Sequence, residues 1–251
     1  MKKGRIDVYF VCSGKYHDID FARMEILKLL SKHECIRTRV AEDYRDIDAI
    51  RNADFLITYT CEVIPTPDQQ KALRDYISEG GRWIALHGTN SILKFMKGGK
   101  VACPDNAPLF MELLGSQFAA HPPLQDFEIT VSDVDHELTR NLQPFTVEDE
   151  IYLIKNAQNI HCLLETRWTG TIREFEDSDW TEDAPRPVMY LNDFGKGQVL
   201  YLTLGHCRGK YDMQPLIDEY YRIERCSWKS PVFYELLERS ILWASTSGEK
   251  E

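Results

Sequence analysis

Three histidines occupy positions where parallel sheets carry their binding sites. His17, His87 and His206 each come at the end of, or shortly after, a run of apolar, β-forming residues. Ligands in open α/β sheets bind beyond the carboxyl ends of the strands, so we expect these imidazoles to meet at one edge of a sheet. Imidazole transfers protons near neutral pH and binds transition metals in its neutral form. The positions therefore predict an acid–base or metal site; the alternative is that each histidine only forms local hydrogen bonds in a loop.

A carboxylate that could join these histidines lies in the acidic cluster of residues 148–150. A carboxylate beside an imidazole orients the ring, accepts a proton or ligates the same metal. Acidic clusters are more often solvated surface, so the spacing alone does not assign this one to a site. It is a candidate whose assignment depends on other landmarks in the chain.

The elements that would position these residues alternate regularly in the first third of the chain. We expect four strands and three helices in turn, at residues 5–13, 21–30, 35–40, 47–52, 54–59, 69–78 and 82–87. Asp20 is the expected N-cap of the first helix, and Pro67 marks the start of the third. The third helix stops at Gly80-Gly81. This order predicts a parallel sheet with right-handed crossovers.

The regular alternation ends after His87. Residues 88–107 contain Gly98-Gly99 and Pro104, and we interpret them as a loop or lid. Residues 174–183 carry six acidic side chains around Trp180 and predict a solvated loop. The remaining expected elements are a short helix, four strands of which the last two form a hairpin, and a closing helix, at residues 109–114, 127–131, 162–166, 188–193, 198–204 and 232–244.

Composition excludes several classes of partner. The chain has 251 residues and a net charge of −10, whereas nucleic acids and anionic membranes require clustered positive charge. No stretch approaches the roughly 18 apolar residues of a membrane span. The length suits one domain over residues 1–251, with no repeat or linker inside it.

Cysteine usage and the absence of several motifs limit which cofactors the chain could bind. The seven cysteines are scattered without a CxxC pair, which favours reduced thiols and a cytoplasmic location. Neither GxGxxG after the first strand nor GxxxxGK[ST] occurs, so we expect no nucleotide cofactor. The GxSxG nucleophile turn and the HExxH zinc motif are also absent.

Taken in order, a set of landmarks along the chain resembles the ThuA-like family, named for trehalose utilisation, within the class I glutamine-amidotransferase-like superfamily. The landmarks are His17-Asp18, GGRWIALHG at 80–88, Phe118 with His121-Pro122, Asp149-Glu150-Ile151-Tyr152, FGKGQV at 194–199 leading into Gly205-His206, and Leu242-Trp243-Ala244. The resemblance implies an α/β, flavodoxin-like three-layer sandwich. Its central sheet would be mainly parallel, with an antiparallel C-terminal hairpin extension.

The resemblance also excludes one activity. Glutamine amidotransferases carry a nucleophilic cysteine at the turn that corresponds to Leu86-His87-Gly88-Thr89, and this chain has no thiol there. The His-x-Glu pair that would activate such a cysteine is missing as well. We therefore expect no glutamine hydrolysis.

Family members are associated with carbohydrate catabolism, which implies an enzyme acting on a sugar or 3-keto-sugar derivative by hydrolysis, elimination or isomerisation. The implied catalytic residues, which are also the candidate ligands of a divalent zinc or manganese ion, are His87, His206 and Glu150. The implied substrate contacts are His17, Tyr16, Tyr152 and His121. We expect His87 to face a cleft shared with His17, Glu150 and His206.

Two alternatives from other classes stay open. One is a non-catalytic sugar-binding or interaction protein that uses the same cleft. The other is a redox protein with reactive thiols at Cys12 or Cys207. Whether the protein is an enzyme or a binding protein, the expected partner is a small carbohydrate derivative. Candidate side chains for stacking on a sugar ring are Trp180, Tyr16 and Tyr211. An assembly of identical chains is also compatible with the sequence.

Overall fold

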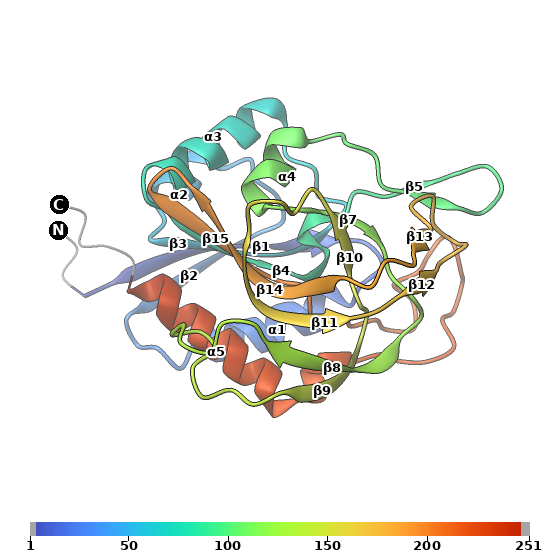
Figure 1. Ribbon diagram of the computed structural model, residues 1–251. Coiled ribbons are helices and arrows are strands. Elements are labelled where there is room, and N and C mark those ends of the chain that lie inside the picture. Colours follow the sequence, from blue (N-terminus) through green and yellow to red (C-terminus); the bar gives the residue numbers. More distant parts are fainter. Residues whose placement is uncertain (1–3, 247–251) are drawn as a thin grey trace.

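A nine-stranded mixed sheet runs through the computed structural model, which describes residues 4–246 (Figure 1). Its order is β2-β1-β3-β4-β15-β14-β11-β8-β9. The first five strands are mutually parallel and span Ile36–Ala41, Ile6–Gly14, Phe55–Cys61, Arg82–Leu86 and Gly197–Leu202. The other four pair antiparallel and span Pro185–Phe194, His161–Arg167, Gln125–Val131 and Phe145–Asp149.

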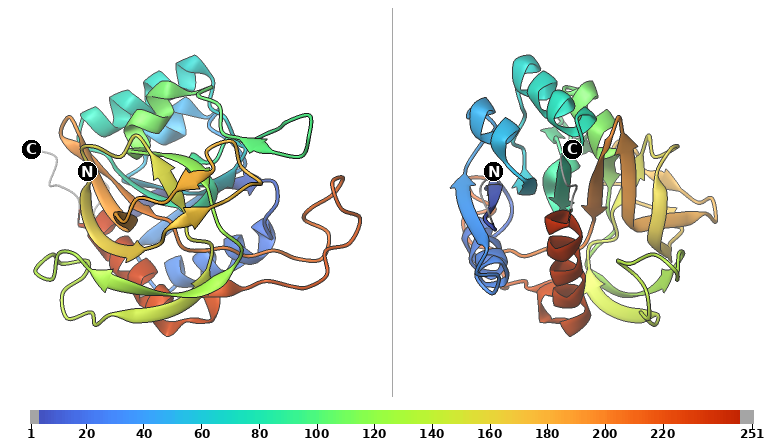
Figure 2. Two further views of the ribbon diagram at one scale, coloured as in Figure 1. Left: turned by 45° about the vertical axis from the view of Figure 1, so that its right-hand side comes forward. Right: turned by 90° about the vertical axis from the view of Figure 1, so that its left-hand side faces the viewer.

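Helices cover both faces of the parallel half. Figures 1 and 2 show α1 and α5 on one face and α2, α3 and α4 on the other; they span Ile19–Leu30, Pro231–Ser245, Ile47–Asn52, Pro67–Ser78 and Pro108–Leu114. Each face carries its own cluster of buried apolar side chains. The expected α/β class with a parallel sheet between two helical layers is confirmed. None of the helices in residues 4–246 is long and apolar enough to cross a bilayer.

The antiparallel extension is larger than the hairpin that the sequence predicts. β14 and β15 form that hairpin around the turn at 194–197, and β11, β8 and β9 then continue the sheet. β9 was not expected because its last residues belong to the acidic cluster. Val147 and Asp149 alternate toward the buried side, so the strand places one acidic side chain inside the protein.

Several local expectations need correction. The N-cap of α1 is Asp18, whose carboxylate accepts the Phe21 N–H at 3.1 Å, and not Asp20. Both residues are acidic and two positions apart, and only Asp18 has the non-helical backbone that a cap requires. The expected strand 82–87 stops at Leu86, because His87–Asn90 forms a 3₁₀ turn, η1.

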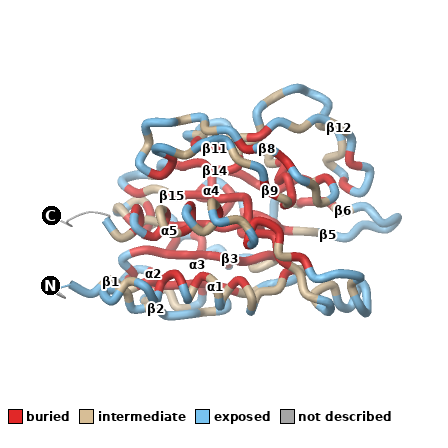
Figure 3. The backbone as a smooth tube through the Cα atoms, turned by 90° about the horizontal axis from the view of Figure 1, so that it is seen from below, coloured by how far each residue is buried: buried red, intermediate tan, exposed pale blue. Residues whose placement is uncertain are grey.

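The expected loops contain further structure. Within residues 88–107, β5 (Lys94–Phe95) and β6 (Val101–Ala102) form a hairpin whose first strand is exposed and whose second strand carries the buried Ala102. The segment 174–183 is not wholly solvated, because Phe175 bridges to Val101 and its ring is buried. Figure 3 shows the sheet strands β3, β14 and β15 buried, whereas β5 and the connections at the rim are exposed. The other short elements are β7 (Gln117–Ala120), β10 (Leu153–Lys155), β12 (Gly170–Thr171), β13 (Asp179–Trp180) and η2 (Cys226–Lys229).

Candidate active site

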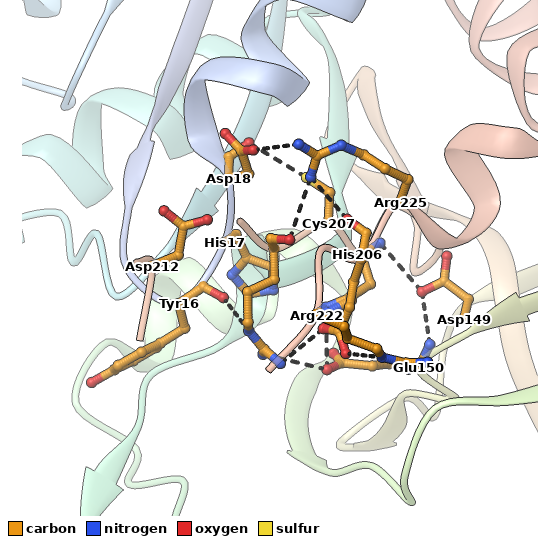
Figure 4. A network of polar contacts seen from close by, with 12 residues as sticks. Tyr16, His17, Asp18, Asp149, Glu150, His206, Cys207, Asp212, Arg222 and Arg225 are labelled. Atoms are coloured by element: carbon orange, nitrogen blue, oxygen red, sulfur yellow. Dashed lines mark hydrogen bonds and ion pairs between the residues drawn. The ribbon is translucent and has the colours of Figure 1, made fainter. Parts of the chain in front are cut away.

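Four of the sequence-predicted site residues meet beyond the carboxyl ends of the parallel strands. One ligand atom from each of His17, His87, Glu150 and His206 lies within 4.8 Å of the other three, and all four side chains are buried. They come from the turns after β1, β4, β9 and β15. Figure 4 shows His17, Glu150 and His206 converging from these separate segments.

A tight turn places His87 at the end of β4. Its backbone adopts φ of +45°, a conformation that is unfavourable for a residue with a side chain. Gly88 follows because a Cβ there would lie 2.8 Å from the Thr60 carbonyl oxygen. The Tyr201 hydroxyl donates to the His87 carbonyl and accepts the Asn90 N–H at 2.9 Å, which holds the turn from the sheet side.

Backbone carbonyls fix the tautomers of two imidazoles. His87 Nδ1 lies 2.8 Å from the Thr203 oxygen, and His17 Nδ1 lies 3.0 Å from the Lys15 oxygen. A carbonyl only accepts, so each Nδ1 carries a hydrogen and each Nε2 of the neutral ring presents a lone pair. The two Nε2 atoms face each other at 2.9 Å. One cation or one proton between them would satisfy both lone pairs.

The third imidazole is oriented by a buried carboxylate. His206 Nε2 donates to Glu224 Oε2 at 2.7 Å. Its Nδ1 lies 3.2 Å from Glu150 Oε1, but the alignment does not make a hydrogen bond and Nδ1 is a buried atom without a partner. His87 Nε2 is 3.6 Å from Glu150 Oε2. Three imidazole nitrogens and one carboxylate therefore point at a common place.

The protonation of the cluster is uneven. Burial holds the pKa of His17 well below its usual range and lowers the pKa of His87 to about 4, so both rings are neutral at pH 7. Burial opposes charge on His206 too, but Glu150 and Glu224 beside it raise its pKa to about 9. Burial disfavours the Glu150 carboxylate, but His121 and His206 beside it outweigh that effect and hold its pKa well below the usual range.

Asp149 ties three segments of the site together. Its fully buried carboxylate accepts the backbone N–H groups of Glu150 at 2.7 Å, Gly205 at 3.0 Å, His206 at 3.2 Å and Ser227 at 3.3 Å. Hydrogen bonds to a charged acceptor are stronger than neutral ones. One side chain therefore fixes the end of β9, the turn after β15 and η2 relative to one another.

A cavity of about 250 Å³ opens above this cluster. On the scale of ~30 Å³ per water it holds on the order of eight waters, comparable to one small ring-shaped ligand. Its polar floor and mostly aromatic or aliphatic walls are formed by Tyr16, His17, Cys61, Ser91, Leu93, Phe95, Val101, Phe118, His121, Glu150, Tyr152, Phe175, Arg208, Met213 and Tyr220. This combination is typical of small-molecule sites.

The expectation that His87 faces the cavity is wrong. His87 and His206 are both 0 % exposed and lie behind His17 and Glu150, which do line it. Tyr152 connects the two layers, since its hydroxyl donates to His87 Nε2 at 3.2 Å. The strained turn at His87 directs the ring inward, which its position after a strand did not reveal.

The remaining expected contacts divide into two groups. Tyr16 and His121 line the cavity, and His121 Nε2 lies 3.6 Å from Glu150 Oε1. Trp180 stacks instead on the Arg186 guanidinium at 5.2 Å, and Tyr211 is 56 % exposed; neither lines the cavity.

Sequence reasoning missed three functional candidates in the segment after His206. Arg208 and Tyr220 line the cavity, and Glu224 orients His206. The backbones of Arg208 and Glu224 pair across the base of this loop, at 3.0 and 2.8 Å. The loop has no helical or strand periodicity, so the sequence offered no signal for this pairing.

The thiols near the site are not of the reactive kind. Burial raises the pKa of both Cys12 and Cys207 to about 12. Reactive cysteines are exposed and have a lowered pKa, because the thiolate is the nucleophile. The redox alternative therefore gains no support from these two residues.

Comparisons with known proteins agree with this architecture. A structure of a ThuA-like protein from Bacteroides uniformis matches with a TM-score of 0.67 at 16% identity, over 98% of this chain and 94% of that one. A ThuA-like protein from Parabacteroides merdae matches with a TM-score of 0.62 at 16% identity, over 96% and 90%. A cytoplasmic protein from Salmonella typhimurium LT2 matches with a TM-score of 0.53 at 14% identity, over 96% and 97%.

At these identities the structural likenesses establish the fold alone. No curated protein matches the sequence. The sequence profile of the ThuA family, which is described by the words trehalose utilisation, matches residues 7–220 and so includes His17, His87, Glu150 and His206. The chain belongs to the ThuA family, which is linked to carbohydrate use.

Proposed function

We propose that the protein is an enzyme of carbohydrate catabolism that acts on a sugar or 3-keto-sugar derivative by hydrolysis, elimination or isomerisation. The observation that carries the proposal is the convergence of three imidazole nitrogens and the Glu150 carboxylate beneath an aromatic-walled cavity. The family's link to trehalose utilisation supports the substrate class. The proposal includes a cytoplasmic location and a small carbohydrate derivative as partner.

A divalent metal fits the donor set. Nitrogen or oxygen donors about 2.0–2.1 Å from one ion are about 2.9–3.4 Å apart. The closest pairs in the cluster are 2.9 Å (His17 to His87) and 3.2 Å (His206 to Glu150). Each ring also donates its other N–H to a carbonyl or carboxylate, as metal-bound histidines do. Zinc and manganese are the proposed ions, and such an ion would polarise a substrate oxygen.

Two cavity residues are suited to proton transfer. His121 Nδ1 donates to the Pro122 carbonyl at 2.8 Å, which leaves a lone pair on Nε2. The ring is partly exposed and lines the cavity, so Nε2 can accept a proton from substrate. Burial raises the pKa of Tyr152 well above its usual range, so its hydroxyl stays protonated. In the metal-free structure this O–H donates to His87 Nε2; a metal on that lone pair would free it to donate to a developing oxyanion.

These groups suffice for the first step that elimination and isomerisation share. His121 takes the proton from a carbon beside the ketone, and the electron pair of that C–H bond moves toward the ketone oxygen. Tyr152 donates a hydrogen bond to that oxygen as its negative charge grows. Positioned acid–base groups of this kind contribute roughly 10²–10⁴-fold each.

The test is to replace His87 and His206 singly by alanine and to measure metal content and turnover of 3-keto-glycosides. His161→Ala is the matched control, because His161 is exposed on β11, far in the sheet from the cluster, and contacts Asp133 and the His136 ring there. We expect stoichiometric metal in the wild type and the control, and loss of both metal and turnover in the site variants. His87→Gln keeps more of the buried volume and serves if alanine prevents folding.

Other outcomes would overturn the proposal. Turnover by the wild type that both site variants retain would show that these histidines are not the site. Tight sugar binding by calorimetry, without metal and without turnover, would favour the non-catalytic binding protein instead.

A further inference from the structure

We infer that a second groove, at the opposite edge of the sheet from the buried cluster, binds a neutral sugar ring through its hydroxyl groups. The groove has a volume of about 380 Å³ and is formed by α4 with its C-terminal glycine, the connection between β10 and β11, and the end of β14. Its lining combines side-chain amides, carboxylates and a small apolar surface. Three features carry the inference: an unused acceptor on a buried amide, the absence of cations from the lining, and the apolar surface.

The groove is separate from the cavity above the histidines. β14 runs antiparallel to β15, and Phe194 pairs with Gly197, the first residue of β15, whereas His206 follows the other end of that strand. In Figure 1 the turn between β14 and β15 lies on the left and β5, which contributes Phe95 to the cavity, lies on the right. The residues that line the groove differ from those that line the cavity, so a ligand here would occupy a site of its own.

Asn192 carries a buried amide with an unused acceptor. The residue is 7 % exposed, and its Nδ2 donates at 2.9 Å to the carbonyl oxygens of both Glu112 and Leu113 at the end of α4. Carbonyls only accept, so the NH₂ group must face the helix, which leaves Oδ1 on the other side. Gly115 permits this close packing, since a Cβ there would lie 2.8 Å from Asn192 Cβ. Oδ1 accepts no hydrogen bond from residues 4–246 and Asn192 lines the groove, so a ligand hydroxyl there would satisfy it.

Three further amides line the groove without a partner in the described part of the chain. They belong to Asn156, Gln158 and Asn159, on the connection between β10 and β11. β11 begins at His161, which pairs with Leu191, so this connection lies beside the end of β14. A side-chain amide both donates and accepts hydrogen bonds, as a sugar hydroxyl does. The four amides therefore suit a ligand that is rich in hydroxyl groups.

The charges of the groove disfavour an anion. Asp105, Glu112 and Asp193 line it, no lysine, arginine or histidine does, and none of the three pairs with a cation within residues 4–246. A phosphorylated sugar or a sugar acid would meet only like charge. The three carboxylates do not form a metal site either, because the described residues contain one group close enough for that, the cluster around His17. Carboxylate oxygens accept hydrogen bonds from hydroxyl groups, so a neutral polyhydroxylated ligand fits them.

The apolar surface suits the C–H face of a sugar ring. It is formed by Phe194, Met111 and Pro108. Aromatic and aliphatic side chains pack on the faces of a ring, while the hydroxyl groups at its edge reach the polar side chains around it. On the scale of ~30 Å³ per water the groove holds on the order of twelve waters, which is enough for one sugar ring with a substituent.

The experiment titrates ¹⁵N-labelled full-length protein with maltose, a neutral disaccharide, and follows the side-chain NH₂ signals of Gln158 and Asn159 by NMR. Galacturonate is the anionic probe and spermidine the cationic one. The test variant combines Gln158→Ala with Asn159→Ala, and both side chains are exposed, so folding should be unaffected. Gln143→Ala is the matched control, because Gln143 is exposed on the connection before β9 and lies outside the groove. Phe194→Leu removes the aromatic face and keeps an apolar side chain.

We expect maltose to shift both NH₂ signals in the wild type and the Gln143 variant, and galacturonate not to shift them. The double variant should bind maltose at least tenfold more weakly, and Phe194→Leu should weaken binding as well. No shift with maltose, a shift with spermidine alone, or equal maltose binding by the double variant overturns the inference. These outcomes leave the proposed function standing, because the double variant retains every residue of the cavity.

Discussion

Replacing Asp149 by asparagine tests whether one carboxylate holds the site together. In the wild type Oδ1 accepts the N–H groups of Glu150 and His206, and Oδ2 accepts those of Gly205 and Ser227. Asparagine keeps one acceptor oxygen and places an NH₂ donor at the other, so two buried N–H groups lose their acceptor. Each unsatisfied group costs about 1–3 kcal/mol, which gives a destabilisation of about 4 kcal/mol.

The assay is urea unfolding of the metal-free protein, with Asp193→Asn as the matched control. The exposed Asp193 accepts only the Gln198 side chain at 2.7 Å, so its replacement should change stability by less than about 0.5 kcal/mol. For a chain of this length a loss of about 4 kcal/mol lowers the Tm by roughly 8–16 °C. Metal affinity should fall too, because Asp149 positions Glu150 and His206. A variant within 1 kcal/mol of the wild type would refute the reasoning.

Three further predictions concern other parts of the argument. Asp18→Ala should cost about 1–2 kcal/mol in urea unfolding and Asp20→Ala less than 0.5, and the reverse order would contradict the assigned N-cap. In the metal-free protein the pKa of His206 is about 9, above its ordinary value of 6.5, so its charge contributes stability that is complete below pH 6.5 and lost as the pH rises to about 9. His206→Gln should flatten this fall in the free energy of unfolding with pH. An unchanged slope would contradict the prediction. Tyr152→Phe should lower kcat at least tenfold while metal content stays unchanged, because its hydroxyl donates to His87 but is not a proposed ligand; unchanged kcat would remove it from the mechanism.

The sequence was most informative where burial imposes a regular pattern. β1, β3 and β4 are short apolar runs, and the structure buries most or all of each. Their carboxyl ends lie at one edge of the sheet, so the sequence alone predicts that His17 and His87 lie close together. Helices α3 and α5 were also predictable, since each begins next to a proline and carries apolar residues at helical spacing.

The parts that could not be predicted depend on long-range pairing. β7 and β10 are four and three residues long and become strands only because they pair with each other. Glu224 lies in a segment without periodicity and reaches His206 because the backbones of Arg208 and Glu224 pair across the loop base. The local sequence pattern of a short segment carries no information about a pairing partner that is distant in the sequence.

The orientation of the His87 ring could not be predicted either, because it also depends on residues distant in the sequence. Its place at a strand end was predictable, but its direction depends on a positive φ, on the Thr203 carbonyl and on the Tyr201 hydroxyl. Two of these three determinants lie more than 100 residues away in sequence. Position could therefore be predicted from a local pattern, whereas the burial of the ring could not.

The neutral rings of His17 and His87 determine whether a proton or a metal cation can bind between them. His17 and His87 present lone pairs to each other at 2.9 Å, and both Nδ1 hydrogens are held by carbonyls. A proton between the rings would relieve the repulsion, but burial lowers the pKa of both, so this proton is absent at pH 7. A cation bound by both Nε2 atoms removes the conflict without protonating either ring. It must also displace the proton of His206, so metal affinity should rise steadily between pH 6.5 and 9.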